Sequence, residues 1–299
     1  MKVLITGAGG FVGREVTREL GEAHELRLTD KTDPNDANYF DSNTGKRVVA
    51  PLKTKWPYLK ADILNLDEMR KAVEGIEAVV HLAANPQGFP EQGVDIFKVN
   101  ALGTFVVLDA CRRAGVKRCF VASSINAFGT FYWRISGKPP VFDHLPLTED
   151  FKPVFEDPYS LSKYVNEETC AAFHRAYGIT TAAFRFAGVW SRDLYAEFTT
   201  KPLPATTEWP EHFLQWVHVA DVACGIRQAL EAPNLPGHGV YTLAAADSRC
   251  PEPTIEILQR LRPDLVKLLT RPLKGRESLL SIERAKKAFG YSPQYRLGP

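Results

Sequence analysis

The chain lacks long apolar runs. No stretch approaches the roughly 20 consecutive apolar residues with which a helix crosses a bilayer. The first residues, Met1 to Thr6, lead directly into a glycine-rich turn, too early for the apolar segment of a signal peptide. These absences predict a cytoplasmic protein with no membrane partner.

Cysteine is scarce and neither sign of charge dominates. The five cysteines among 299 residues are odd in number and contain no Cys-x-x-Cys pair, which argues against a disulfide framework and a zinc site. We therefore expect reduced, mostly buried thiols and no bound metal. The 37 basic and 35 acidic residues give a net charge of +2, spread evenly along the chain. This distribution argues against nucleic acid and favours a small-molecule partner.

Short apolar runs alternate with helical patterns, and 44% of the residues are hydrophobic. This alternation is typical of a doubly wound α/β fold of the Rossmann type, in which helices cover both faces of a parallel sheet. The expected strands are 2–6, 25–29, 58–61, 78–82, 118–123 and 180–186, and the expected helices are 12–20, 66–73, 95–114, 159–177 and 219–230.

The alternation of expected strands and helices is interrupted in two regions. Residues 31–57 are rich in proline, asparagine and glycine, and we expect an irregular excursion there. Prolines also become frequent after residue 187. We predict a Rossmann-type domain over 1–187, to which a helix at 219–231 returns, and a small C-terminal cap formed by 188–218 and 232–299.

Three glycines follow the first expected strand at regular spacing. Gly7, Gly10 and Gly13 permit a tight turn, a close approach of the backbone to a pyrophosphate, and tight packing of the next helix. The start of that helix would offer free N–H groups to the phosphates. A purely structural turn is the alternative, but the position between an apolar strand and an amphipathic helix favours a dinucleotide loop.

Asp30 closes the second expected strand. An acidic side chain there accepts hydrogen bonds from the adenosine ribose and repels a 2′-phosphate, which favours NAD over NADP. The alternative is that Asp30 only begins a turn with Asp33 and Pro34.

A proton-transfer pair is predicted in the middle of the chain. Tyr159 and Lys163 lie four residues apart on an expected helix and are therefore neighbours. An ammonium group beside a phenol favours the phenolate, so a tyrosine with an ordinary pKa of about 10 can act as a base. Ser124 follows the fifth expected strand and can hold a substrate oxygen beside Tyr159.

These motifs resemble those of the extended short-chain dehydrogenase/reductase family, the NAD-dependent epimerase/dehydratase group. The resemblance rests on Thr6-Gly7-x-x-Gly10-x-x-Gly13, Asp62-Ile63, His81-Leu82-Ala83-Ala84, Asn100-x-x-Gly103-Thr104, Ser123-Ser124, Tyr159-x-x-x-Lys163 and Arg185, in order over residues 1–190, and on the later segment from His218 to Ala223. It implies an NAD enzyme with Ser124, Tyr159 and Lys163 as catalytic residues. The implied cofactor-binding residues are Gly7, Gly10, Phe11, Val12, Gly13, Asp30, Asp62, Ile63, Leu82, Ala83, Ala84, Asn100, Tyr159, Lys163 and Ala187.

Two departures from the family pattern bear on the substrate. Members that act on nucleotide sugars usually carry asparagine where Gly188 stands and arginine where Leu214 stands, and both groups hold the sugar diphosphate. Other motifs, including Asp30 and Trp216, are similar to those of uronate dehydrogenases, relatives that oxidise a free sugar acid. We therefore expect an oxidoreductase that acts on a hydroxyl of a sugar or sugar acid.

Several side chains near the expected site are candidates for holding such a substrate. Arg134 and Arg192 can bind a carboxylate with two parallel hydrogen bonds. Seven aromatic residues flank the expected site and can stack on a sugar ring, and core or cap packing is the alternative for each: Phe128, Phe131, Tyr132, Trp133, Trp190, Trp209 and Trp216. An epimerase that uses the same residues and a non-catalytic NAD(H) sensor remain alternative functions, and a homodimer remains open.

Overall fold

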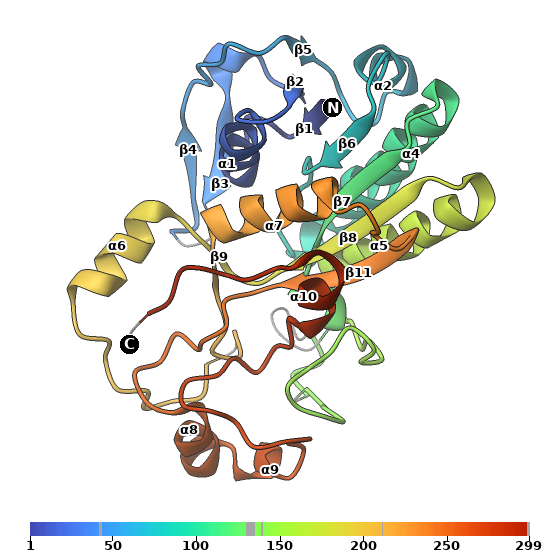
Figure 1. Cartoon of the computed structure of the whole chain (residues 1–299). Helices are drawn as coiled ribbons and strands as arrows, with labels where there is room; N and C mark the ends of the chain where they lie inside the picture. The colour runs from blue at the N-terminus through green and yellow to red at the C-terminus, as the bar shows by residue number, and fades with distance from the viewer. Residues whose placement is uncertain (42–43, 130–134, 139, 211, 298–299) are drawn as a thin grey trace.

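A seven-stranded, fully parallel sheet forms the centre of the protein (Figure 1). The computed structural model describes residues 1–41, 44–129, 135–138, 140–210 and 212–297. The strand order is β11-β8-β7-β6-β1-β2-β5. The bounds are β1 Lys2–Thr6, β2 Glu25–Asp30, β5 Tyr58–Lys60, β6 Ala78–His81, β7 Arg118–Ser124, β8 Thr180–Phe186 and β11 His238–Leu243.

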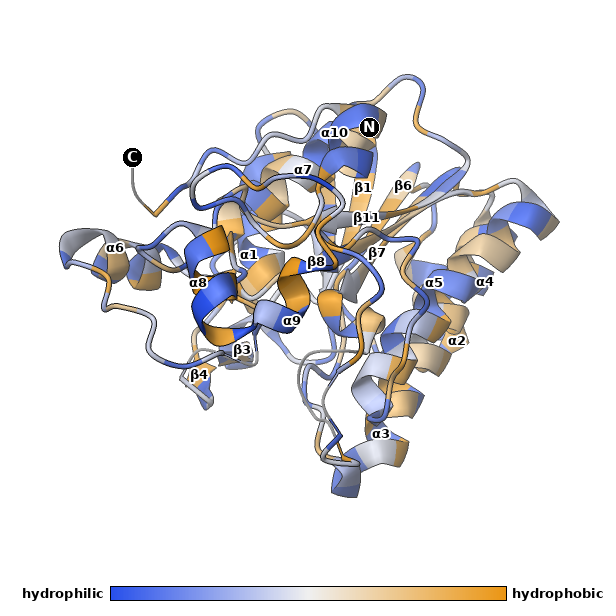
Figure 2. Ribbon diagram, turned by 90° about the horizontal axis from the view of Figure 1, so that it is seen from below, coloured by the Kyte–Doolittle hydropathy of each residue, from blue (hydrophilic) through white to orange (hydrophobic). Residues whose placement is uncertain are grey.

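Helices cover both faces of this sheet, which confirms the doubly wound prediction (Figure 2). Successive side chains of a strand point to opposite faces, so Val3 and Ile5 join one core while Leu4 joins the other. The first core is closed by α1 (Phe11–Leu20), α7 (Val219–Glu231) and α10 (Glu283–Phe289), and the second by α2 (Leu66–Ala72), α4 (Gly103–Ala114) and α5 (Pro158–Tyr177).

The order in which the chain adds strands to the sheet reverses between β1 and β6. From β1 it runs outward through β2 to β5, and then returns to β6 on the other side of β1. Open parallel sheets bind ligands at such a reversal, beyond the carboxyl ends of the strands. The fold therefore places the candidate site at the loops that follow β1 and β6.

The expected helix 95–114 is interrupted in the structure. It consists of α3 (Gly93–Phe97), a π-helical turn (Lys98–Leu102) and α4. Asn100 lies in the π-helical turn, where its side chain accepts a hydrogen bond from the Asn85 amide at 2.8 Å and donates to the Asn85 carbonyl at 3.0 Å. A π-helical turn widens the helix by one residue, and it often occurs at functional sites.

Residues 31–57 are more regular than expected. They contain an antiparallel hairpin of β3 (Asn38–Asp41) and β4 (Lys46–Val49), preceded by a short 3₁₀ turn (Pro34–Asp36). The density of proline and glycine predicted an irregular excursion. The hairpin was missed because the pairing of two four-residue strands depends on cross-strand contacts, which composition does not reveal.

The expected cap boundary does not hold for one strand. β11 lies within 232–299 but pairs in parallel with β8 at the edge of the main sheet. α7 packs on α1, and Arg227 of α7 forms an ion pair with Glu19 of α1 at 2.8 Å. The chain after residue 187 thus contributes both to the sheet and to a separate set of elements: β9 (Val189–Trp190), β10 (Val217–His218), α6 (Arg192–Thr200), α8 (Thr254–Leu261) and α9 (Pro263–Val266).

The five cysteines are free thiols, and all except Cys224 are buried. Within the described ranges, no helix is long and apolar enough to cross a membrane.

Candidate active site

The glycine-rich loop after β1 is packed so closely that side chains cannot fit at two of its positions. A Cβ atom on Gly13 would lie 2.1 Å from the Gly7 carbonyl oxygen, and one on Gly7, whose φ is +70°, would lie 2.6 Å from the Ala83 nitrogen. α1 begins after Gly10 without a capping side chain or an acidic residue in its first turn. Its first N–H groups are therefore suited to receive a pyrophosphate.

Asp30 ends β2 beside this loop. Its carboxylate accepts hydrogen bonds from the Gly9 amide at 3.1 Å and from the Lys31 amide at 2.8 Å. Burial nevertheless raises the pKa of Asp30 above its ordinary value, and the backbone hydrogen bonds oppose that rise. The partly buried carboxylate thus lies next to the glycine-rich loop, which its predicted role at the adenosine ribose of NAD requires.

The other residues predicted to line NAD also follow strand ends. Asp62 and Ile63 come after β5, and Ala187 comes after β8. Leu82, Ala83 and Ala84 follow β6, beside the glycine-rich loop. Asn100 is buried and acts on the loop after β6 through its hydrogen bonds to Asn85.

His81, the last residue of β6, has a structural role. Its Nδ1 lies 2.7 Å from the Thr6 hydroxyl, and its Nε2 lies 3.2 Å from the Thr104 hydroxyl. Burial lowers the pKa of His81 to about 3, and the nearby charge of Lys163 adds to this effect. The imidazole is therefore neutral and links β1, β6 and α4.

Ser124, Tyr159 and Lys163 come together at the carboxyl ends of β7 and β8. Asp157 caps α5 by accepting a hydrogen bond from the Ser160 amide at 2.8 Å, and Pro158 occupies the first helical position. This start orients Tyr159, and Ser124 lies close enough to the Tyr159 hydroxyl to lower the pKa of the phenol. The Lys163 ammonium group lies 5.6 Å from the centre of the Tyr159 ring and donates to the Ala122 carbonyl at 2.9 Å.

The pKa of the Tyr159 phenol differs from the sequence-based expectation. Burial raises the pKa of Tyr159 to about 12, although the Ser124 hydrogen bond lowers it, and Lys163 is not among the causes. Burial also lowers the pKa of Lys163 to about 8, while Glu167 opposes that change. Desolvation dominates both pKa values because burial removes water from around the charged form of each group.

Glu167, which sequence reasoning did not single out, supports the lysine from the next helical turn. It forms a buried ion pair with Arg185 of β8 at 2.7 Å and accepts a hydrogen bond from the Ser123 hydroxyl at 2.6 Å. The Arg185 guanidinium also lies 4.3 Å from the centre of the Phe128 ring. The spacing of four residues from Lys163 was the available signal, but the partners of Glu167 come from other strands.

Positions 188 and 214 present no polar side chain to a ligand. Among the described residues, a Cβ atom on Gly188 would meet only the Gln215 carbonyl oxygen, at 3.9 Å, so these residues leave room for a small side chain here. Leu214 is buried in the core with a left-handed φ of 61°. Gln215 accepts a hydrogen bond from the Gly188 amide at 3.1 Å and donates to the His212 carbonyl at 2.8 Å.

The predicted substrate-holding residues have different outcomes. Phe131, Tyr132, Trp133 and Arg134 lie outside the described residues. Arg192 is paired with Glu15 of α1 at 2.5 Å. Trp190 and Trp216 are buried in an aromatic cluster with ring centres 5.0 Å apart, so they pack in the core.

Arg249 is a further arginine of this region that the sequence analysis did not consider. Its backbone amide donates to the Leu214 carbonyl at 2.9 Å, and its guanidinium lies 5.7 Å from the centre of the Trp190 ring. Its position after β11 carries no motif, so only the folded chain places it beside Leu214.

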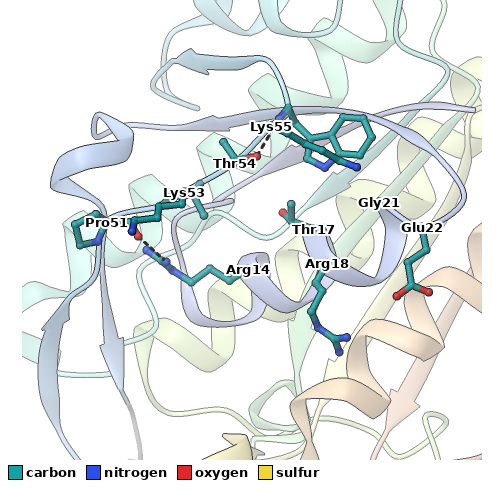
Figure 3. Close-up of a pocket in the computed structure, with 11 residues that line it drawn as sticks. Arg14, Thr17, Arg18, Gly21, Glu22, Pro51, Lys53, Thr54 and Lys55 are labelled. Atoms are coloured by element: carbon teal, nitrogen blue, oxygen red, sulfur yellow. Dashed lines mark hydrogen bonds between the residues drawn. The ribbon is translucent and has the colours of Figure 1, made fainter.

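A cavity of about 630 Å³ lies between α1 and the segment 51–56 (Figure 3). Its lining contains Arg14, Arg18, Lys53 and Lys55, with Glu22 as its acidic residue, and includes none of Ser124, Tyr159 and Lys163. The cavity is therefore separate from the proton-transfer residues.

A family model matches residues 3–244, and its description is the NAD-dependent epimerase/dehydratase family. An NAD-dependent glucose-6-phosphate dehydrogenase of Haloferax volcanii is 34% identical over 130 residues, which cover 43% of this chain and 45% of that protein. A putative UDP-glucose 4-epimerase of Methanocaldococcus jannaschii is 29% identical over 192 residues, which cover 63% of this chain and 56% of that protein. The chain thus spans about half the length of these relatives.

The fold is also found in a crystal structure of a short-chain dehydrogenase/reductase superfamily protein of Agrobacterium tumefaciens with bound NAD. The TM-score is 0.68 at 20% identity, and the match covers 99% of this chain and 94% of the other.

Proposed function

Because the chain belongs to the NAD-dependent epimerase/dehydratase family and is an enzyme that uses NAD, we propose that it oxidises a hydroxyl of a free sugar or sugar acid. The observation that carries this proposal is the meeting of Ser124, Tyr159 and Lys163 at the sheet edge that also holds the glycine-rich loop. This arrangement suits removal of a hydroxyl proton next to a bound dinucleotide.

In this proposal the three side chains have separate roles. Ser124 holds the substrate oxygen by a hydrogen bond. Tyr159 accepts the hydroxyl proton as a general base, and its closeness to Ser124 supports a substrate oxygen held between the two side chains. Lys163 holds positive charge close to the phenol and keeps its own position through the Ala122 carbonyl.

The residues of the glycine-rich loop fit the cofactor. Gly7 and Gly13 permit the close packing of the loop, and the uncapped start of α1 leaves N–H groups for a pyrophosphate. Asp30 would accept hydrogen bonds from the adenosine ribose. NAD, when bound, supplies the acceptor for the substrate hydride and a positive charge that favours the phenolate form of a neighbouring tyrosine. That second effect opposes the desolvation that raises the pKa of Tyr159.

The proposed substrate is a small sugar instead of a nucleotide sugar. Gly188 and Leu214 carry no side-chain donor for a diphosphate, and the Gly188 amide already donates to Gln215. The similarity to a glucose-6-phosphate dehydrogenase supports oxidation of a sugar hydroxyl. We also propose that 188–218 and the part of 232–299 outside the sheet form the cap over this substrate.

Sugar epimerisation is the second candidate, and the similarity to a putative UDP-glucose 4-epimerase favours it. An epimerase would use Ser124, Tyr159 and Lys163 in the same roles and give no net change in NAD.

The NAD content of the purified protein tests the choice between these reactions. A dehydrogenase exchanges its cofactor at each turnover, so we expect the protein to be purified with far less than one NAD per chain. Added aldoses or uronates should then reduce added NAD. Retention of one NAD per chain through gel filtration, without NADH formation from any free sugar, would contradict the proposal.

We further propose that the enzyme is a homodimer. Large apolar side chains are exposed along α3, the π-helical turn, α4 and the neighbouring α5, and Val94 and Phe105 are 83% and 51% exposed. Such a strip is typical of a surface that a second copy covers. The mass in solution tests this, and Phe105→Glu should shift a dimer to the monomer. A wild-type monomer at high concentration would contradict it.

A further inference from the structure

Arg14, in the first turns of α1, joins two segments that are distant in sequence. Its Nε donates to the Gly9 carbonyl at 2.9 Å, and its terminal nitrogens donate to the Pro51 carbonyl at 3.2 Å and to the Ala50 carbonyl. Figure 3 shows the side chain extended from α1 toward Pro51. The ring of Tyr39 in β3 lies 5.8 Å from the guanidinium carbon. One partly buried cation thus contacts both the glycine-rich loop and the 31–57 excursion.

The excursion itself touches the glycine-rich loop. Ala37 is fully buried, and its Cβ lies 3.2 Å from the place that a Cβ on Gly9 would occupy. The Ala50 amide donates to the Ala37 carbonyl at 2.9 Å, and the Leu52 amide donates to the Pro34 carbonyl at 2.7 Å. The carbonyls that Arg14 holds therefore belong to the same hydrogen-bonded unit that covers Gly9.

Both backbone polar groups of Gly9 form hydrogen bonds with side chains. Its N–H donates to the Asp30 carboxylate at 3.1 Å, and its carbonyl accepts from Arg14. Asp30 is the residue positioned to contact the adenosine ribose, so the orientation of this part of the loop depends on Arg14 as well as on Asp30.

We propose that Arg14 is a positioning residue that ties the 31–57 excursion to the glycine-rich loop and thereby sets the affinity for the adenosine half of NAD. The proposal rests on the use of NAD and not on the reaction catalysed, so its failure is distinguishable from failure of the proposed function.

The same contacts determine what Arg14 does not do. Arginine near the ribose is the usual partner of the 2′-phosphate of NADP. Here three backbone carbonyls take up the guanidinium, and a turn toward a 2′-phosphate would leave two partly buried oxygens, those of Gly9 and Ala50, without this donor. Arg14 therefore supports the binding of NAD and does not serve as a partner for the 2′-phosphate of NADP.

Binding of NAD and NADP to Arg14→Met and Arg14→Lys tests this role. The methionine fills the space without donors, and the lysine keeps the charge but lacks the fork that spans several carbonyls. We expect both variants to bind NAD roughly tenfold or more weakly, as the loss of charged hydrogen bonds predicts. Arg18→Met is the matched control, because Arg18 lies one turn later on α1, lines the same cavity and pairs with Glu15 alone among the described contacts. It should bind NAD within about twofold of the wild type, since no such bond to the loop is lost.

Unchanged NAD affinity in Arg14→Met would overturn the proposal, and so would a loss confined to NADP, which would make Arg14 a phosphate-binding residue. Hydrogen exchange of the wild-type protein tests the same proposal without the variants, so this test does not depend on their folding. We expect NAD to slow exchange at the Ala50 and Leu52 amides more than at the Gly178 amide, which ends α5. Equal exchange with and without NAD at Ala50 and Leu52 would also overturn it.

Discussion

The chain up to Ala187 and the chain after it build their parts of the molecule in different ways. In the first region, the glycine-rich loop, Asp30 and Ser124 all lie at the carboxyl ends of parallel strands, so the sheet itself gathers them. In the second region, buried carboxylates hold the C-terminal segment. Asp221 accepts hydrogen bonds from the Gln294 and Tyr295 amides at 2.9 and 3.1 Å.

The difference shows which interactions each region depends on. Backbone pairing between neighbouring strands orders the cofactor side and is insensitive to most single side chains. The C-terminal side depends on a few long-range contacts, such as the stacking of Tyr295 on His218 with ring centres 3.5 Å apart. Apart from the closely packed glycines, substitutions at the site residues of the first region should therefore affect chemistry, and substitutions at these long-range contacts of the second region should affect stability.

Tyr159→Phe should have the largest effect and should change chemistry alone. The ring still packs, but no proton can move, so we expect turnover to fall by about 10²–10⁴-fold with unchanged NAD affinity. Tyr164→Phe, a half-buried tyrosine on the same helix, is the control and should remain near wild type. Steady-state kinetics and NAD titration measure both, and activity of Tyr159→Phe within a few-fold of wild type would contradict the role of base.

Asp221→Asn should change the pH dependence of stability. Burial raises the pKa of Asp221 from 3.8 to about 6 in the folded protein. As the pH rises from 4 to 6, the Asp221 carboxyl group therefore loses its proton in the unfolded chain before it does so in the folded protein. The free energy of unfolding of the wild type falls over this range by up to about 3 kcal/mol. Asparagine does not ionise, so the stability of the variant should be flatter in this range.

Thermal unfolding at several pH values measures this difference. The exposed Asp193 provides the control, because Asp193→Asn should keep the wild-type slope. A wild-type slope in Asp221→Asn would show that another group causes the pH dependence.

Two glycine substitutions should separate a tight position from an open one. Gly13→Ala places a methyl group 2.1 Å from the Gly7 carbonyl, so it should cost about 1–3 kcal/mol of stability and weaken NAD binding. Gly188→Ala meets only one atom at 3.9 Å and should stay within about 0.5 kcal/mol of wild type. Denaturant unfolding compares them, and equal losses would mean that position 188 is more crowded than its geometry indicates.

The same contrast explains what the sequence could predict. β1 and β8 have the predicted bounds, because apolar runs between turn residues mark buried parallel strands clearly. β11 was missed, since Pro236 and Gly237 precede it and its partner β8 lies more than fifty residues earlier. The raised pKa of Tyr159 was missed as well, because burial is a property of the whole fold.

The family resemblance and the use of NAD are confirmed by the family match over residues 3–244. The roles of Ser124, Tyr159 and Lys163 and of the individual NAD-lining residues stay predictions. Motif order could indicate them, but contacts such as those of Glu167 and Arg14 required the folded chain.

The ratio of NADH formed to sugar converted tests the central claim most directly. The protein is incubated with NAD and, in separate reactions, with free aldoses, uronates and UDP-sugars, while NADH and the sugar products are measured together. The account predicts one NADH for each molecule of a free sugar or sugar acid oxidised, and no conversion of UDP-sugars. Efficient epimerisation of a UDP-sugar without net NADH would contradict it.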